Sequence, residues 1–199
     1  MGKYLKDFAT HAEYESYING GEAILPNVSI CDDQPTHVHY KPSMGPSIRV
    51  IYNVTDTEAD TKLASGSYLP ASAFTAMYVD GVKISGIQSS YRFDTGGEHI
   101  VDFELNPNET EIGYQWFSES GLNIVGFQIP QQITTIDNSS LYSEEESYYI
   151  ILLSQTPPEL GEYAFGGKIS AIYVPPSAVD TYKNANVWVS YADIIGPHV

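Results

Sequence analysis

The chain has 199 residues, of which 42% are hydrophobic, and 9 Lys and Arg stand against 25 Asp and Glu, which gives a formal net charge of -16. Length and hydrophobic content predict a folded protein of one large or two small domains, not a disordered chain. The negative charge repels polyanions and so argues against binding to nucleic acid or acidic lipid. A single cysteine excludes internal disulfides, so stability is expected from packing or assembly.

The N-terminus lacks the apolar segment of an export signal, and no stretch approaches the roughly 20 apolar residues of a membrane span. We therefore expect neither export by the general secretory path nor membrane insertion.

Residues 1–45 are predicted to form an extended arm with one short helix. Thr10 and Glu13 make a capping box for a helix over 11–18, which Asn19-Gly20-Gly21 ends. The following residues, 22–47, contain four prolines and few periodic apolar positions, a pattern typical of extended chain.

The arm also contains the residues that raise the question of a metal site. They are Cys31, Asp32, Asp33, His37 and His39. On a strand, His37 and His39 would point to the same face, which favours a metal site. No second pair of closely spaced ligands occurs elsewhere, so the favoured interpretation is a turn at the aspartates followed by a short strand, and no metal or other cofactor is expected.

A small antiparallel β-domain is predicted over residues 46–106. Residues 48–54 are rich in β-branched side chains, and Asp80-Gly81 lies between two apolar runs in 75–87, a strong hairpin signal. In residues 98–105, apolar and acidic residues alternate as on a half-buried strand, with Asp102 and Glu104 on the solvent side.

Residues 107–199 are predicted to form a short repeat region with a C-terminal cap. The hexapeptides 112–117, 136–141 and 160–165 begin 24 residues apart, and a short apolar strand follows each one, at 127–129, 151–153 and 172–174. The expected core is Ile112, Phe117, Ile129, Ile136, Leu141, Leu153, Leu160, Phe165 and Val174. One strand in each unit of 20–29 residues is typical of a leucine-rich-repeat stack. The alternative is an ordinary β-domain with accidental spacing.

The cap is predicted from the last 25 residues. Ser177 is expected to cap a helix that runs through about Ala185, followed by an apolar tail with Trp188, Tyr191 and Ile194. The β-domain is expected to cover the other end of the stack. Together these elements predict a mainly β protein.

The repeat region resembles the BspA-type leucine-rich repeats of surface proteins of Bacteroidetes and of their phages. The resemblance covers about residues 110–195 and is most specific at the closing segment IYVPPSAVDTYK, 172–183. The middle repeat, 136–141, lacks the phenylalanine and the glycine of the pattern.

The arm is similar to an N-terminal segment shared by virion proteins of crAss-like phages that infect Bacteroides. The matching segments lie in residues 7–42 and include FATHAEYESYING, ILPNVSIC and HVHYKP. The resemblance implies an attachment segment, best fitted by head-fibre or other particle-surface proteins. The side chains expected to dock on a capsid protein or a sister chain are Phe8, Tyr14, Tyr17, Ile18, Leu25, Pro26 and Tyr40.

No catalytic motif is present: the chain has no G-x-S-x-G, no H-E-x-x-H and no phosphate-binding glycine loop. A glycosidase pair from Glu109 and Glu111, or from 144–146, is an alternative that sequence leaves open, although a solvated acidic loop is favoured for 144–146. We expect no enzymatic activity.

Two functions remain. The first is a phage head-fibre or capsid-decoration subunit, assembled in the host cytoplasm, anchored on the virion exterior by its arm and displaying the repeat region. The second is a bacterial surface adhesin or carbohydrate-binding module, which would need an export signal. For the first, the expected partners are capsid proteins, a second copy in a homodimer or else a trimer, and host-surface glycans contacted through exposed aromatic residues.

Overall fold

The computed structural model describes residues 45–118, 121–142 and 147–198. Several expectations fall outside this part of the chain: the helix over 11–18, the acidic residues 144–146, the docking residues Phe8, Tyr14, Tyr17, Ile18, Leu25, Pro26 and Tyr40, and the metal candidates Cys31, His37 and His39. Residues Gly45–Val199 form one unit of the fold.

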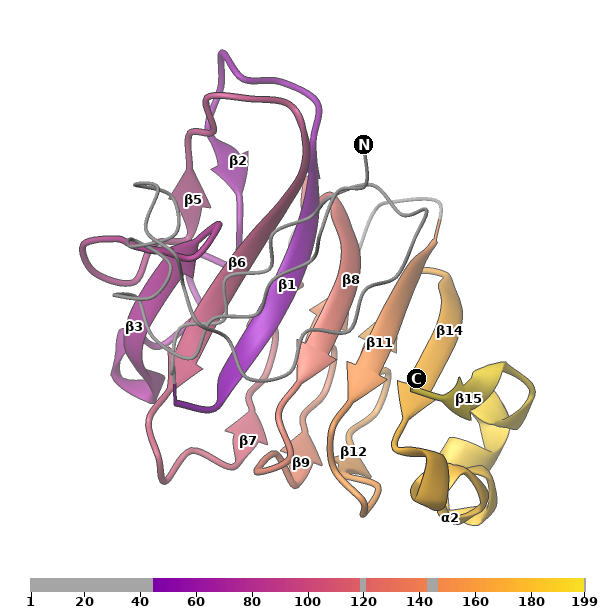
Figure 1. The fold of residues 1–199 in the computed structure, drawn as a ribbon. Coiled ribbons are helices and arrows are strands. Elements are labelled where there is room, and N and C mark those ends of the chain that lie inside the picture. The colour runs from indigo at the N-terminus through magenta and orange to yellow at the C-terminus, as the bar shows by residue number, and fades with distance from the viewer. Residues whose placement is uncertain (1–44, 119–120, 143–146, 199) are drawn as a thin grey trace, which may run out of the picture. The chain divides into compact units, whose positions relative to one another are not determined.

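The described part is mainly β, as predicted, and is built on one large mixed sheet of eight strands (Figure 1). From one edge to the other the strand order is β15-β14-β11-β8-β1-β6-β3-β4. In chain order these strands are β1 (Ser47–Val54), β3 (Phe74–Val79), β4 (Val82–Lys83), β6 (Gly97–Leu105), β8 (Ile124–Ile129), β11 (Tyr148–Leu152), β14 (Ile169–Val174) and β15 (Ile195–Pro197).

Short strands form three smaller sheets, and short helical segments complete the fold. The sheets are β12-β9-β7, β10-β13 and β2-β5. Their strands are β2 (Thr61–Lys62), β5 (Ser90–Tyr91), β7 (Glu111–Ile112), β9 (Thr135–Ile136), β10 (Leu141–Tyr142), β12 (Glu159–Leu160) and β13 (Phe165–Gly166). The helical segments are the 3-10 helices η1 (Ala71–Ala73), η2 (Pro176–Ala178) and η3 (Trp188–Ile194) and the α-helix α2 (Val179–Asn184).

The predicted Asp80-Gly81 hairpin is confirmed. Strands β3 and β4 pair antiparallel, with Tyr78 opposite Lys83 and Val79 opposite Val82. The turn needs two left-handed residues, and Asp80 has φ 48° and Gly81 φ 80°. Aspartate and glycine adopt this conformation at the least steric cost, which is why the pair is so strong a signal.

In the C-terminal half, residues 24 apart in the sequence lie side by side in parallel strands. Ile136 pairs with Ile112 on one side and with Leu160 on the other. Leu141 likewise lies between Phe117 and Phe165. The fourth residue of each hexapeptide has a left-handed backbone, with φ 54° at Gln115, 53° at Ser139 and 54° at Tyr163. The three hexapeptides therefore turn in the same way.

Most of the expected core residues of this half are buried. Fully or nearly fully buried are Ile112, Phe117, Ile129, Ile136, Leu141, Phe165 and Val174, whereas Leu160 is half-buried. Leu153 was wrongly chosen, because the strand register puts Leu152 opposite Ile129 and Leu152 is the buried residue. The spacing between Ile129 and its partner is 23 residues, not 24, so the period predicted the wrong neighbour.

The antiparallel and parallel strands belong to the same sheet because β1 pairs antiparallel with β8, with Val50 opposite Phe127. Beneath this junction lies a chain of aromatic rings from both halves. The successive centroid distances are 5.6 Å from Phe74 to Phe103, 5.3 Å to Phe117, 5.9 Å to Phe127 and 5.8 Å to Tyr148. Edge-on and tilted contacts of this kind stabilise a core beyond its buried area.

The C-terminal helical segments differ from the prediction in their cap. Helix α2 begins at Val179 with Ala178 as its N-cap, and no side chain caps it. The Ser177 hydroxyl instead donates to Gln155 Oε1 at 2.8 Å, because η2 carries the chain through the preceding turn. The expected tail is packed as predicted: Trp188 is buried with its Nε1–H donating to the Pro158 carbonyl at 2.8 Å, and Tyr191 and Ile194 pack against the core.

Buried tyrosines predict a loss of stability at alkaline pH. Burial raises the pKa of Tyr52, Tyr148 and Tyr182 above the usual value of 10.0. Unfolded phenols ionise from about pH 10, while the folded ones hold their protons, so the stabilisation is complete below that pH and is lost as the pH rises toward the folded pKa values. Urea unfolding should give a smaller free energy at about pH 11 than at about pH 8, and Tyr182→Phe should reduce the difference. Equal stability at the two pH values would contradict this.

Candidate functional site

The side of the large sheet that faces away from the apolar core carries a mixed polar and aromatic row. On β1 the core side chains are Ile48, Val50, Tyr52 and Val54, so the alternate residues point to the opposite face. The strand register aligns residues of this second face across the sheet, in the order Lys83, Tyr78, Asp102, Arg49, Gln128, Ile151 and Tyr173. We call this the transverse row.

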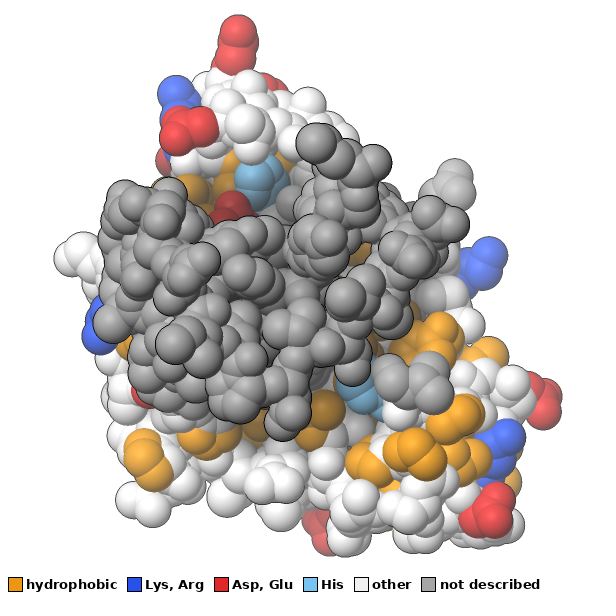
Figure 2. All heavy atoms as spheres, in the orientation of Figure 1, with side chains coloured by type: hydrophobic (Ala, Val, Ile, Leu, Met, Phe, Trp, Pro, Cys, Tyr) orange, Lys and Arg blue, Asp and Glu red, His pale blue; other side chains and the backbone are white. Residues whose placement is uncertain are grey.

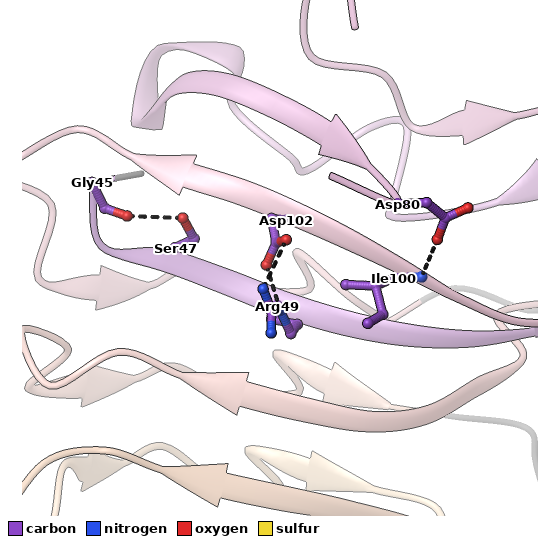
Figure 3. A network of polar contacts seen from close by, with 6 residues as sticks. All are labelled: Gly45, Ser47, Arg49, Asp80, Ile100 and Asp102. Carbon is purple, nitrogen blue, oxygen red and sulfur yellow. Dashed lines mark hydrogen bonds and ion pairs between the residues drawn. The ribbon is translucent and has the colours of Figure 1, made fainter. Parts of the chain in front are cut away.

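An ion pair lies in the middle of the transverse row. The Arg49 guanidinium donates from Nε to Asp102 Oδ1 at 2.8 Å and from Nη2 to Oδ2 at 3.2 Å, and Figure 3 shows the two side chains pointing toward one another from β1 and β6. The side chains are only 16% and 3% exposed. Asp102 was predicted to face solvent; it is buried instead, and Arg49 compensates its charge. A bidentate ion pair of this kind fixes the orientation of both side chains.

The neighbours of the pair on this face are mostly polar or aromatic. Tyr78 donates its hydroxyl to Glu104 Oε2 at 3.2 Å, and Tyr149 and Tyr173 pack edge to face at 6.3 Å on β11 and β14. Burial of Tyr149 raises the pKa of its phenol, and the charge of Glu98 adds to the effect. The charges of Arg49 and Asp102 cancel locally, and the rest of the row consists of one lysine, two tyrosines, one glutamine and one isoleucine.

The arrangement that comes nearest to a catalytic one is Asp80, His99 and Thr95. His99 Nδ1 lies 2.7 Å from Asp80 Oδ2, but Nε2 lies 2.8 Å from the Thr95 carbonyl oxygen and 3.4 Å from its hydroxyl. A general base needs a free lone pair directed at its nucleophile. Here the second nitrogen is directed at a carbonyl, so the group serves structure and not nucleophile activation.

Glu109 and Glu111 form one of the two candidate glycosidase pairs that the sequence left open. Glu109 Oε1 accepts the Glu111 backbone N–H at 3.2 Å, which makes a local turn of these two residues. Among residues 45–118, 121–142 and 147–198, no group of three or more His, Cys, Asp or Glu side chains is placed to hold a metal ion.

A polar hollow of about 420 Å³ near the end of β1 is lined by residues that include Asn53, Asp56, Lys62 and Asn123.

Hydrophobic side chains gather on the visible surface over the C-terminal elements around α2 and β15, whereas most visible charged side chains lie toward the periphery (Figure 2). Exposed apolar residues of this part of the chain are Tyr173, Val187 and Val189, with 38%, 44% and 60% of their surface exposed. Val187 also has φ 66°, a strained conformation for a β-branched residue. We call these three residues the C-terminal apolar surface.

No protein-family model matches the sequence, and no curated protein matches it. Within the described residues, the structure contains no helix long and apolar enough to cross a membrane.

Sequence reasoning did not find the polar groups of this site. Arg49 and Asp102 are 53 residues apart, and Asp80 and His99 are 19 apart, so local patterns do not link them. The available signal was weak: an acidic residue lies between Val101 and Phe103, but the same strand also carries Glu98 and Glu104. A carboxylate there calls for a cation on the neighbouring strand, and Arg49 is the only basic residue of β1.

Proposed function

We propose that this chain is a structural subunit of a phage virion, a head-fibre or capsid-decoration protein whose N-terminal arm binds the capsid. On this proposal, the β-rich unit is displayed on the particle exterior and takes no part in enzymatic chemistry. The alternative is a bacterial surface adhesin or carbohydrate-binding module of the same repeat type.

The similarity of residues 7–42 to virion proteins favours this proposal over the adhesin, and the structural observation that supports it is the agreement between the BspA-like pattern and the strand pairing. The hexapeptide residues that define the 24-residue spacing are those that pair in parallel, as Ile112, Ile136 and Leu160 do. Residues 172–183, the most specific part of the pattern, span the end of β14, η2 and most of α2. These features support a short leucine-rich-repeat stack that one helical cap closes.

Assembly is part of the same proposal. A short stack has two ends to cover, and a symmetric homodimer, or a trimer, would cover exposed apolar area. The C-terminal apolar surface supports self-association because exposed apolar side chains gain free energy when a partner covers them. Contact with host-surface glycans would use exposed aromatic residues such as Tyr163, which is 76% exposed.

Immunogold electron microscopy separates the two functions. Antibodies raised against residues 45–199 should label intact particles of the phage whose genome encodes the chain, at many positions on the capsid surface. Uninfected host cells serve as the matched control and should not be labelled. If the surfaces of uninfected cells were labelled and the phage particles were not, the adhesin function would be favoured instead.

A further inference from the structure

The three hexapeptide turns of the repeat region form one continuous surface. Their first residues pair side by side in β7, β9 and β12 (Figure 1), and their last residues, Phe117, Leu141 and Phe165, pair in the same order. The third and fourth residues therefore also lie side by side, at about the 4.8 Å spacing of neighbouring strands. We call them the hexapeptide ridge: Tyr114, Gln115, Asn138, Ser139, Glu162 and Tyr163.

Tyrosines lie at the two ends of the hexapeptide ridge. Tyr114 is 46% exposed at the first turn, and Tyr163 is 76% exposed at the third. Two strand spacings, about 10 Å, separate their backbones. Tyr68, itself 47% exposed, packs edge to face against Tyr114 at 5.3 Å. Its loop is held there by the Ser65 N–H, which donates to the Trp116 carbonyl at 2.9 Å.

The hydroxyls of these three tyrosines are open to a ligand. Within the part of the chain that the structure describes, Tyr68, Tyr114 and Tyr163 make no side-chain hydrogen bond. Buried phenols of the same fold do make one, as when Tyr148 donates to the Gly166 carbonyl at 2.7 Å. Each exposed tyrosine therefore offers an apolar ring face and a polar hydroxyl together.

Asn138 is fixed between the two aromatic ends. Its Oδ1 accepts the Glu162 N–H at 2.5 Å, and its own backbone N–H donates to Asp137 Oδ1 at 2.6 Å. Gly161 permits this close approach, since a Cβ there would collide with Asn138 Oδ1. The amide nitrogen has no partner among the described residues, so its two N–H donors are available to a ligand.

Aromatic rings separated by amide and hydroxyl groups fit a carbohydrate better than a protein partner. A protein interface is built on a contiguous, desolvated apolar core, whereas Asn138 and Ser139 lie between the rings here. A glycan has C–H faces that stack on rings and hydroxyls that bond to amides. The ridge has one carboxylate, Glu162, and no basic side chain, and the net charge of the chain is -16. A neutral glycan is therefore favoured over an acidic one.

We propose that the hexapeptide ridge, together with Tyr68, binds a neutral oligosaccharide that lies across the three turns. Its sugar rings stack on Tyr114 and Tyr163, and its hydroxyls accept from the Asn138 amide between them. The biological role of this site rests on the proposed function, because a displayed subunit is what would meet host glycans. The binding itself is a property of the chain alone.

The test is binding of the fluorescently labelled full chain to an array of immobilised oligosaccharides. The array carries neutral hexose and N-acetylhexosamine oligomers from bacterial, plant and animal polysaccharides, and comparable oligomers that contain uronic or sialic acids. We expect capture by neutral oligomers and not by acidic ones. Capture by no neutral oligomer, or by acidic ones alone, would overturn the proposal.

Ring variants then locate the site, by titration calorimetry with the neutral oligomer that the array captures most strongly. Tyr114→Ala and Tyr163→Ser should each weaken binding about tenfold, the effect of one lost stacking contact. Serine suits the second position because the middle unit has Ser139 there, with the same left-handed backbone.

Tyr173→Ala is the matched control and should leave the affinity unchanged. Tyr173 is 38% exposed and packs edge to face on Tyr149, much as Tyr114 packs on Tyr68, but it lies on β14 and not on the ridge. If the two ridge variants bound as the unmodified chain does, or if Tyr173→Ala weakened binding equally, the proposal would fail.

Asn138→Asp tests the hydrogen bonds. It keeps the acceptor that holds the Glu162 N–H and replaces the two amide donors by a carboxylate oxygen. Binding should fall about tenfold or more, while the circular dichroism spectrum stays the same. Unchanged affinity would contradict a ligand that lies across the middle turn and so overturn the proposal.

Failure of the glycan site and failure of the virion function give different results. A chain that captures no neutral glycan but is found on phage particles would lose the glycan site only. A chain that captures neutral glycans but is absent from the particles would keep the site and lose the virion function.

Discussion

Arg49→Met should destabilise the β-rich unit by about 3–5 kcal/mol, because it leaves the carboxylate of Asp102 buried without a counter-ion. Asp102 is only 3% exposed, and both of its oxygens accept from Arg49. Chemical denaturation followed by circular dichroism measures the change.

Two further variants isolate the cause. Arg92→Met removes a guanidinium that pairs with Asp60 where both side chains are more than half exposed, and it should cost no more than about 1 kcal/mol. Arg49→Met combined with Asp102→Leu removes both charges and should recover most of the lost stability, since apolar replacements of buried pairs are often neutral. If Arg49→Met cost no more than Arg92→Met, the buried ion pair would not be a structural element of this face.

The second large effect is expected for Phe117→Ala, at about 3–5 kcal/mol. Phe117 is fully buried, and its ring lies between Phe103 of the antiparallel half and Phe127 of the parallel half. Truncation leaves a cavity at the junction, where neither half can collapse without moving the other.

Phe117→Leu is the matched control, because it keeps most of the volume and should cost clearly less than the alanine variant. Both variants should unfold in one transition, since β1 and β8 share the sheet. Two separate transitions in Phe117→Ala would contradict this account and would mean that the halves fold independently.

The features that local chemistry determines could be predicted from the sequence. Asp80-Gly81 predicted its hairpin because few residue pairs accept two consecutive left-handed conformations. The 24-residue spacing predicted which residues lie side by side, as with Ile136 and Leu160, because parallel pairing places equivalent positions of successive units together. The mainly β character followed from the same patterns.

The features that depend on distant strands could not be predicted. Nothing local to Ile48–Val54 indicates that β1 pairs with β8, more than 70 residues later in the chain. The ion pair of Asp102 likewise depends on the pairing of β1 with β6, which brings Arg49 beside it. The buried residue opposite Ile129 is Leu152 and not Leu153, because loop lengths differ between units and a fixed period does not record such differences.

On the proposed function, residues 1–44 anchor the chain and the β-rich unit is displayed. The most direct measurement is a pull-down of purified phage capsids with the full chain and with a version that begins at Gly45, after circular dichroism has shown that the shorter version is folded. We expect capsid binding by the full chain only. Equal binding by both versions would place the contact on the β-rich unit, and binding by neither would contradict the virion function altogether.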